Sequence, residues 1–224
     1  MSTQSEQRLA KDNKQVVDTR QAYNIWSKQY DTNINKTRDL EAYALRTILA
    51  GIHFDTCLEI GCGTGKNTEW LITKAKQVTS VDLSDEMLAK AKEKISPGAA
   101  QFIQADITSQ WTFRDQLYEV VTFSLVLEHI QNLDHIFREV AESLVDGGQV
   151  YVGELHPFKQ YTGSKARFET GEGTQIVPCF NHHISDFTQS AKCHGLSITD
   201  INEYFDDSDK TGIPRILTLI FKKI

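Results

Sequence analysis

Three glycines follow a short apolar run in Leu58-Glu59-Ile60-Gly61-Cys62-Gly63-Thr64-Gly65. Glycines at the carboxyl end of a strand permit a tight turn whose backbone N–H groups can approach a ligand closely. A P-loop is excluded because Ile60 stands where that loop needs glycine and Asn67 where it needs serine or threonine. The dinucleotide fingerprint G-x-G-x-x-G fails at Lys66. The remaining G-x-G-x-G pattern suits a ligand whose amino-acid end, rather than a pyrophosphate, lies against the turn.

Two aspartates end the next two predicted strands. Asp82 lies about 20 residues beyond Gly63, where a carboxylate can accept both hydroxyls of a ribose. Asp106, in Gln104-Ala105-Asp106-Ile107, can accept a hydrogen bond from an adenine amino group. Either aspartate alone is better explained as a helix cap or a solvated turn residue. Both follow a strand, as the glycine turn does, and this combination favours a nucleoside site.

The elements that must position these residues alternate between short apolar strands and helix-length segments. A serine cap at Ser84 begins one predicted helix, and Asp146-Gly147-Gly148 is expected to end another, built on Ile136, Val140 and Leu144. This alternation predicts an α/β fold with a doubly wound, Rossmann-like parallel sheet and helices on both faces. The strands are expected at 56–60, 77–81, 101–104, 119–124 and 149–153.

The flanking regions depart from this alternation. Helices are predicted at 21–30 and 40–50, joined by a polar stretch at 31–39. The glycine-rich segment 156–180 is a candidate binding loop or lid because it is too long for an ordinary connection. A helix at 185–193 precedes strands at 197–204 and 215–222, which we expect to form a terminal antiparallel pair at the sheet edge.

Four motifs in order resemble those of class I S-adenosylmethionine-dependent methyltransferases, in particular the small-molecule group that includes quinone-biosynthesis enzymes. They are Leu58 to Gly65, Val81-Asp82-Leu83-Ser84, Gln104 to Ile107 and Tyr118 to His129. The resemblance covers roughly residues 40–155. It implies a seven-stranded sheet with one antiparallel strand, S-adenosylmethionine as cofactor and S-adenosylhomocysteine as product.

The resemblance also implies roles for individual residues. Gly61 and Gly63 would lie against the methionine part of the cofactor, and Glu59 would support their turn from beneath. Asp82 would bind the ribose, Leu83 and Ile107 the adenine faces, Asp106 the adenine amino group, and Ser124 the methionyl end. Relatives often place an aromatic and basic lid ahead of the sheet, where this chain has Tyr23, Trp26, Tyr30 and Arg38; packing on a helix face explains these residues equally well.

Length, charge and composition limit the number of domains, the partners and the cellular location that we expect. The 224 residues predict one domain, divided into a helical lid at 1–50, a cofactor-binding half at 51–155, a substrate-side insertion at 156–180, and a final helix and strand pair at 181–224. A net charge of −6 argues against nucleic-acid binding. The polar start and the absence of a long apolar run lead us to expect a cytoplasmic protein without membrane contact, as a monomer or homodimer.

The function expected from these features is methyl transfer to an oxygen or nitrogen of a small-molecule acceptor, whose identity the sequence does not reveal. His156 is the first candidate for a general base because it follows the fifth strand, and His183 is the reserve. Cysteine and histidine spacings predict no metal site. The alternatives are a nucleotide-dependent oxidoreductase and a non-catalytic cofactor-binding or regulatory protein; a fatty-acid cyclopropane synthase is a minor one.

Overall fold

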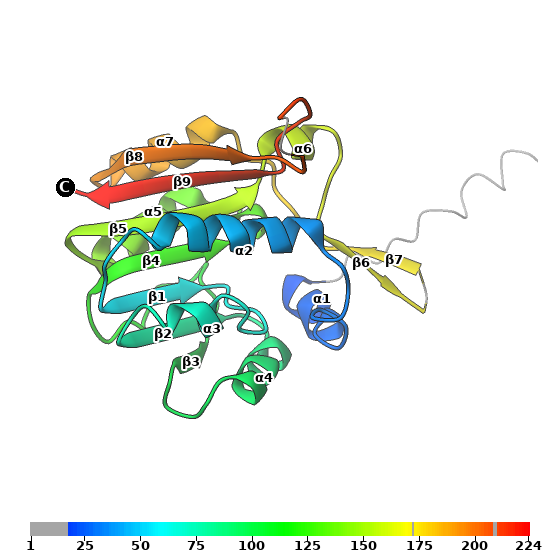
Figure 1. Ribbon diagram of the computed structural model, residues 1–224, viewed down its shortest axis with the longest axis horizontal. Coiled ribbons are helices and arrows are strands. Elements are labelled where there is room, and N and C mark those ends of the chain that lie inside the picture. Colours follow the sequence, from blue (N-terminus) through cyan, green and yellow to red (C-terminus); the bar gives the residue numbers. More distant parts are fainter. Residues whose placement is uncertain (1–17, 172, 208–209) are drawn as a thin grey trace, which may run out of the picture.

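The computed structural model describes residues 18–171, 173–207 and 210–224. Its centre is a seven-stranded sheet in the order β3-β2-β1-β4-β5-β9-β8 (Figure 1). Strand β9 runs antiparallel to both of its neighbours, and the remaining pairs are parallel. The strands are β1 (Thr56–Ile60), β2 (Gln77–Asp82), β3 (Gln101–Gln104), β4 (Tyr118–Ser124), β5 (Leu144–Leu155), β8 (Leu196–Tyr204) and β9 (Ile216–Lys223). This topology confirms the predicted fold class and the antiparallel terminal pair.

Helices cover both faces of the sheet (Figure 1). On one face, α2 (Lys36–Leu49) and α3 (Thr68–Leu71) contribute to one apolar core. On the other face, α5 (Leu133–Ser143) and α7 (Ile184–Cys193) contribute to a second core. Helix α4 (Asp85–Lys94) connects β2 to β3. None of these described helices is long and apolar enough to cross a membrane.

Strand β1 shows why the parallel strands are almost continuously apolar. Cys57 belongs to the core under α2 and α3, whereas its neighbour Leu58 belongs to the core under α5 and α7. Successive side chains of a strand point to opposite faces, so a strand covered on both sides can carry apolar residues at successive positions. Both side chains are fully buried.

A third apolar cluster joins the N-terminal helix to a small hairpin. Helix α1 (Thr19–Trp26) lies beside the two-stranded sheet of β6 (Arg167–Thr170) and β7 (Gly173–Ile176) (Figure 1). The ring of Trp26 stacks on that of Phe168 with centroids 5.1 Å apart. This cluster is separate from the two sheet cores, so α1 is held mainly by the hairpin and by α4.

Strand β5 begins earlier than the sequence predicted. Helix α5 ends at Ser143, and the run Asp146-Gly147-Gly148, expected to terminate that helix, lies inside β5. Leu144 pairs with Tyr118 of β4, and the register between β4 and β5 then shifts. An apolar residue at 144 satisfies both the helical pattern and the strand, so apolar spacing could not separate the two.

Two other boundaries also differ. Helix α2 begins at Lys36 because the side chain of Asn35 caps it, accepting a hydrogen bond from Arg38 N at 3.0 Å. Because α1 ends at Trp26, the connection between the two helices covers residues 27–35 instead of the predicted 31–39. The predicted loop at 156–180 contains α6 (Pro157–Tyr161) and the β6–β7 hairpin. By contrast, the Ser84 cap is confirmed, since its hydroxyl accepts from Met87 N at 3.1 Å.

Candidate functional site

A cavity of about 300 Å³ opens at the carboxyl ends of β1, β2 and β4; we call it the first cavity. The chain leaves β1 toward β2 on one side, while β4 lies on the other. Such a switch point is where open α/β sheets bind ligands, because the crossover loops diverge there. Seven of the eight predicted cofactor residues line this cavity: Gly61, Gly63, Asp82, Leu83, Asp106, Ile107 and Ser124.

The glycine turn forms one wall of the first cavity. Gly61 has φ of +73°, and a Cβ there would lie 2.1 Å from Cγ2 of Val126. Gly63 has φ of +54°, and its Cβ would meet no atom within 4 Å. Glycine is therefore required at 61 by both conformation and space, whereas at 63 only the backbone conformation requires it.

Asp82 anchors the turn and keeps hydrogen-bonding capacity. Its carboxylate accepts from Gly63 N at 2.8 Å and from Ser84 N at 2.8 Å. An ionised carboxylate offers about four lone-pair sites, so two backbone bonds leave capacity for two hydroxyl donors. Burial raises the pKa of Asp82, although the backbone N–H groups oppose that shift. This geometry fits the predicted ribose contact.

Asp106 stands farther along the same cavity. One carboxylate oxygen accepts from both the backbone N–H and the hydroxyl of Thr108, at 2.9 and 2.6 Å. In the described part of the chain, the other oxygen has no partner. It is therefore available to a donor such as an adenine amino group, between the side chains of Leu83 and Ile107 that also line the cavity.

A buried polar network lies behind Ser124. The amide nitrogen of Asn67 donates to Ser124 Oγ and to Glu41 Oε2, each at 3.2 Å, and the hydroxyl of Tyr151 donates to Glu41 at 3.0 Å. Burial raises the pKa of Glu41 to about 7. Asn67 Oδ1 is buried without a hydrogen-bond partner among the described residues. Asn67 does not line the first cavity, so this network holds Ser124 in place from behind the cavity wall.

Glu59 lies outside the cavity lining. It is buried in β1, where its Oε2 accepts hydroxyl hydrogen bonds from Thr68 at 2.5 Å and Ser80 at 2.7 Å. Thr68 begins the helix that follows the glycine turn. Glu59 therefore links β1, β2 and α3 beneath the turn, as the resemblance implied, and does not itself face the ligand.

The pKa of Glu59 predicts how the stability of the protein changes with pH. Burial raises its pKa from the ordinary 4.5 to about 7, although the two hydroxyls oppose this. Glu59 binds a proton more tightly in the folded protein than in the unfolded chain. Its contribution to the stability of the fold is therefore fully present below pH 4.5 and is lost as pH rises through about 7. Glutamine stays neutral at all these pH values. As pH rises from 5 to 8, the free energy of unfolding of Glu59→Gln should therefore increase by roughly 1–3 kcal/mol relative to that of wild type.

Urea unfolding of both proteins at pH 5 and at pH 8 measures this change. Glu86→Gln, at an exposed position on α4, is the matched control and should follow wild type at both pH values. Identical pH dependences for wild type and Glu59→Gln would contradict the assignment.

A second cavity of about 370 Å³ adjoins the first. Tyr23, Tyr30 and Leu125 line both, so these three side chains form a shared wall. Leu125 has φ of +59°, a conformation that costs a branched residue roughly 1–3 kcal/mol and that concentrates at ligand sites. Basic residues line the second cavity, whereas the first is lined by Asp18, Asp82 and Asp106 and by neither lysine nor arginine among its described residues.

Tyr23 and His129 are hydrogen-bonded at this shared wall. The Tyr23 hydroxyl lies 2.8 Å from His129 Nε2, and His129 Nδ1 lies 2.7 Å from the Pro178 carbonyl oxygen. A carbonyl only accepts, so Nδ1 carries the proton and Nε2 accepts from the tyrosine. His129 lines the first cavity. His129 is the last residue of the fourth motif, which predicted no site role for it.

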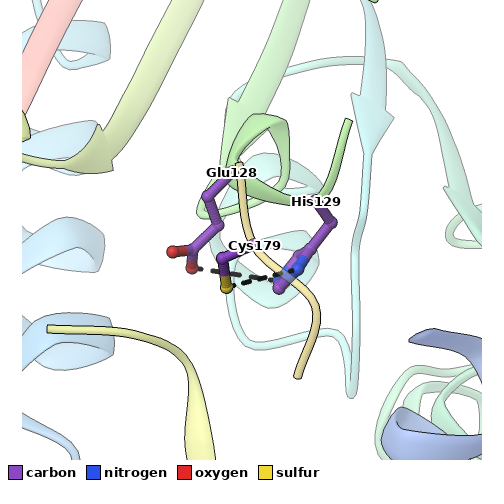
Figure 2. Close-up of side chains that lie close together, drawn as sticks. All are labelled: Glu128, His129 and Cys179. Carbon is purple, nitrogen blue, oxygen red and sulfur yellow. Dashed lines mark hydrogen bonds and ion pairs between the residues drawn. The ribbon is translucent and has the colours of Figure 1, made fainter. Parts of the chain in front are cut away.

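Glu128 and Cys179 lie beside His129 (Figure 2). The ligand atoms of the three side chains are within 4.8 Å of one another, as in a possible metal site. Both His129 nitrogens are already hydrogen-bonded within the protein, however, and burial raises the pKa of the Cys179 thiol to about 12. A metal would have to displace those bonds and remove that proton, so the arrangement favours a hydrogen-bonded cluster.

The two histidines chosen from the sequence do not face the cavities. His156 is fully buried; its Nδ1 accepts from Phe158 N at 3.1 Å, and its Nε2 lies 2.9 Å from Glu203. It thus caps α6, and the expectation that it points into an acceptor pocket is wrong. His183 is exposed, and its Nδ1 lies 2.5 Å from the Tyr161 hydroxyl. Neither histidine lines the first or second cavity.

The expected lid residues divide into two groups. Tyr23 and Tyr30 line both cavities, as a lid requires. Trp26 lines only the second and packs mainly in the α1–hairpin cluster. Arg38 lies over the Tyr30 ring, 5.2 Å from its centroid, and donates to the carbonyl oxygens of Tyr30 and Asn33. It therefore holds the segment after α1 in place and lines neither cavity.

Known proteins share this fold and these motifs. Residues 58–152 match the model of the methyltransferase domain family. A ubiquinone biosynthesis O-methyltransferase of Nitrosomonas europaea is 31% identical over 111 residues, which are 49% of this chain and 47% of that enzyme. A malonyl-[acyl-carrier protein] O-methyltransferase of Bacillus cereus is 25% identical over 89% of this chain and 81% of its own length. This chain therefore spans about half the length of the first of these relatives.

A solved structure agrees with the architecture. An S-adenosylmethionine-dependent methyltransferase of Listeria monocytogenes superposes with a TM-score of 0.70 at 22% identity, covering 83% of this chain and 99% of its own. The fold of this chain is that of the solved structure, and the first cavity lies at the switch point of its sheet. Residues 58–152, which contain the four motifs, match the methyltransferase domain family. Both findings support the resemblance to class I S-adenosylmethionine-dependent methyltransferases that the motifs predicted.

Proposed function

We infer that this protein transfers the methyl group of S-adenosylmethionine to an oxygen or nitrogen atom of a small molecule. The observation that carries this proposal is the pair of cavities with a shared wall of Tyr23, Tyr30 and Leu125. A methyl donor in the first cavity and an acceptor in the second would meet at this wall. Holding two reactants in contact is the main source of rate in such a transfer.

The first cavity suits the charge and shape of the donor. Its three aspartates and its lack of described basic residues favour the positively charged sulfonium compound. Gly61 and Gly63 would lie along the methionine part, Asp82 on the ribose, and Asp106 on the adenine. Ser124, held by the amide nitrogen of Asn67, would meet the amino-acid end.

When bound, S-adenosylmethionine supplies an electrophilic methyl carbon, to which the acceptor's lone pair bonds while the methyl–sulfur bond breaks. The chain must then position the acceptor and accept any proton that it loses. Tyr23 Oη can accept a hydrogen bond from the acceptor because its own hydrogen is directed at His129 Nε2. The proton would pass through this hydroxyl to the imidazole, whose other nitrogen is fixed by Pro178.

The two other functional classes are less consistent with these cavities. A nucleotide-dependent oxidoreductase must bind a pyrophosphate, and the described residues of the first cavity provide three acids and no basic side chain for it. A non-catalytic binding protein would not need a second cavity that shares a wall with the first.

A thermal-shift experiment tests the cofactor assignment. S-adenosylhomocysteine at 100 times its Kd should stabilise the protein by about 2.7 kcal/mol, and NAD should have no effect. Asp82→Ala removes the carboxylate that would bind the ribose hydroxyls, so about tenfold or more of the affinity should be lost. Equal stabilisation by NAD, or an unchanged affinity in Asp82→Ala, would refute the proposal.

A further inference from the structure

The second cavity concentrates positive charge in a protein whose formal net charge is −6. Four basic side chains from distant parts of the sequence line it: Lys36, Lys165, Arg167 and Arg215. Glu128 is the only acid among its described lining residues, and burial raises the pKa of that carboxyl. Four basic side chains against one acid make the field inside the cavity positive.

Three of the four basic groups have no close acid partner among the residues that the structure describes. Arg215 forms an ion pair with both carboxylate oxygens of Asp206. Over the described ranges, Lys36, Lys165 and Arg167 form no salt bridge. Asp206 interacts with Lys36 at longer range, but it is already paired with Arg215. The cavity therefore contains positive charge that the acidic residues described in the structure do not neutralise.

Helix α2 adds a second source of positive potential. Its N-cap Asn35 and its first two residues, Lys36 and Thr37, line the cavity. The helix has 14 residues, and the positive end of its dipole lies at this wall. A helix N-terminus with basic side chains beside it is a favourable site for an anion.

We propose that the second cavity binds the methyl acceptor through an anionic group of the carboxylate or phosphate class. This inference rests on the proposed methyltransferase function. The acids of the first cavity repel an anion, while the basic residues of the second attract it. The acceptor is thereby oriented with its charged end toward Lys36 and Arg167 and its nucleophilic atom toward the shared wall.

Isothermal titration calorimetry on the full chain, saturated with S-adenosylhomocysteine, tests this assignment. The probes are inorganic phosphate, succinate and the uncharged succinamide. We expect phosphate or succinate to bind and succinamide not to bind. Lys36→Glu and Arg167→Glu should each weaken anion binding by about tenfold. Both side chains are exposed and free of salt bridges in the described structure, so the fold should be unaffected.

Lys28→Glu is the matched control because Lys28 is exposed, lies outside both cavities and gives the same change in net charge. It should bind the anions as wild type does. Absence of anion binding, equal binding of succinamide, or equal weakening in Lys28→Glu would overturn the inference. Binding of S-adenosylhomocysteine is measured first and separates the two proposals. If the protein binds S-adenosylhomocysteine but no anion, only the anion-site proposal is overturned. If it does not bind S-adenosylhomocysteine, the proposed function is overturned.

Discussion

Gly61→Ala should lower the affinity for S-adenosylhomocysteine by roughly 100-fold. Alanine at position 61 would be unfavourable for two reasons, the backbone conformation and a steric clash. The residue would have to keep φ of +73°, and its Cβ would lie 2.1 Å from Val126 Cγ2. The turn or Val126 must therefore move, and both line the first cavity. Calorimetric titration with S-adenosylhomocysteine measures the loss, and the melting temperature reports whether the domain still folds.

Two further variants separate the contact from the backbone strain. Gly98→Ala has the same type of backbone cost, with φ of +85°, but its Cβ would meet nothing within 4 Å. It should lower stability modestly and leave the affinity unchanged. Gly61→Ala combined with Val126→Ala removes the clashing methyl and should recover part of the affinity. Wild-type binding in Gly61→Ala would show that the turn does not shape the cofactor site.

His129→Gln should lower turnover by about 100-fold or more with any hydroxyl or protonated-amine acceptor that wild type methylates. Glutamine can still hydrogen-bond to Tyr23 but cannot take up a proton. Binding of S-adenosylhomocysteine should remain within a few-fold of wild type. Tyr23→Phe should cause a similar loss of turnover, and the double variant should be no worse than either single variant, because the two side chains act in one chain of hydrogen bonds.

His156→Gln provides the comparison. Its imidazole is buried between Glu203 and the first turn of α6, so the variant should be less stable yet turn over at nearly the normal rate. Burial lowers the pKa of His156, and the Glu203 carboxylate opposes that shift. Normal turnover and an unchanged pH profile in His129→Gln would exclude a proton-accepting role for that residue.

The cofactor half of the site could be predicted because its residues follow from local rules. Glycines after a strand and acids at strand ends are sequence-local features, and parallel strands bring their carboxyl ends to one edge. Gly61, Asp82 and Asp106 therefore line one cavity as expected. The alternation of strands and helices also predicted the parallel sheet, and the last two strand patterns predicted the antiparallel pair of β8 and β9.

The acceptor side could not be predicted in this way because it is assembled from distant segments. Lys36, Arg167 and Arg215 meet only after α2, the hairpin and β9 have packed. The choice of His156 relied on its place after a strand, but Pro157 begins α6 there, and the histidine caps that helix. The sequence contains no local signal for His129, because its partners Tyr23 and Pro178 lie 106 and 49 residues away.

The shared wall has a consequence for the order of binding. Tyr23 and Tyr30 line both cavities, and the helix that carries Tyr23 is held by a cluster separate from the two sheet cores. A ligand that fixes these side chains from one cavity removes part of the ordering cost for a ligand in the other. Thermodynamic linkage makes this effect reciprocal, so each substrate tightens the binding of its partner by the same factor. Initial-rate kinetics would then show the apparent KM of each substrate falling as the other approaches saturation.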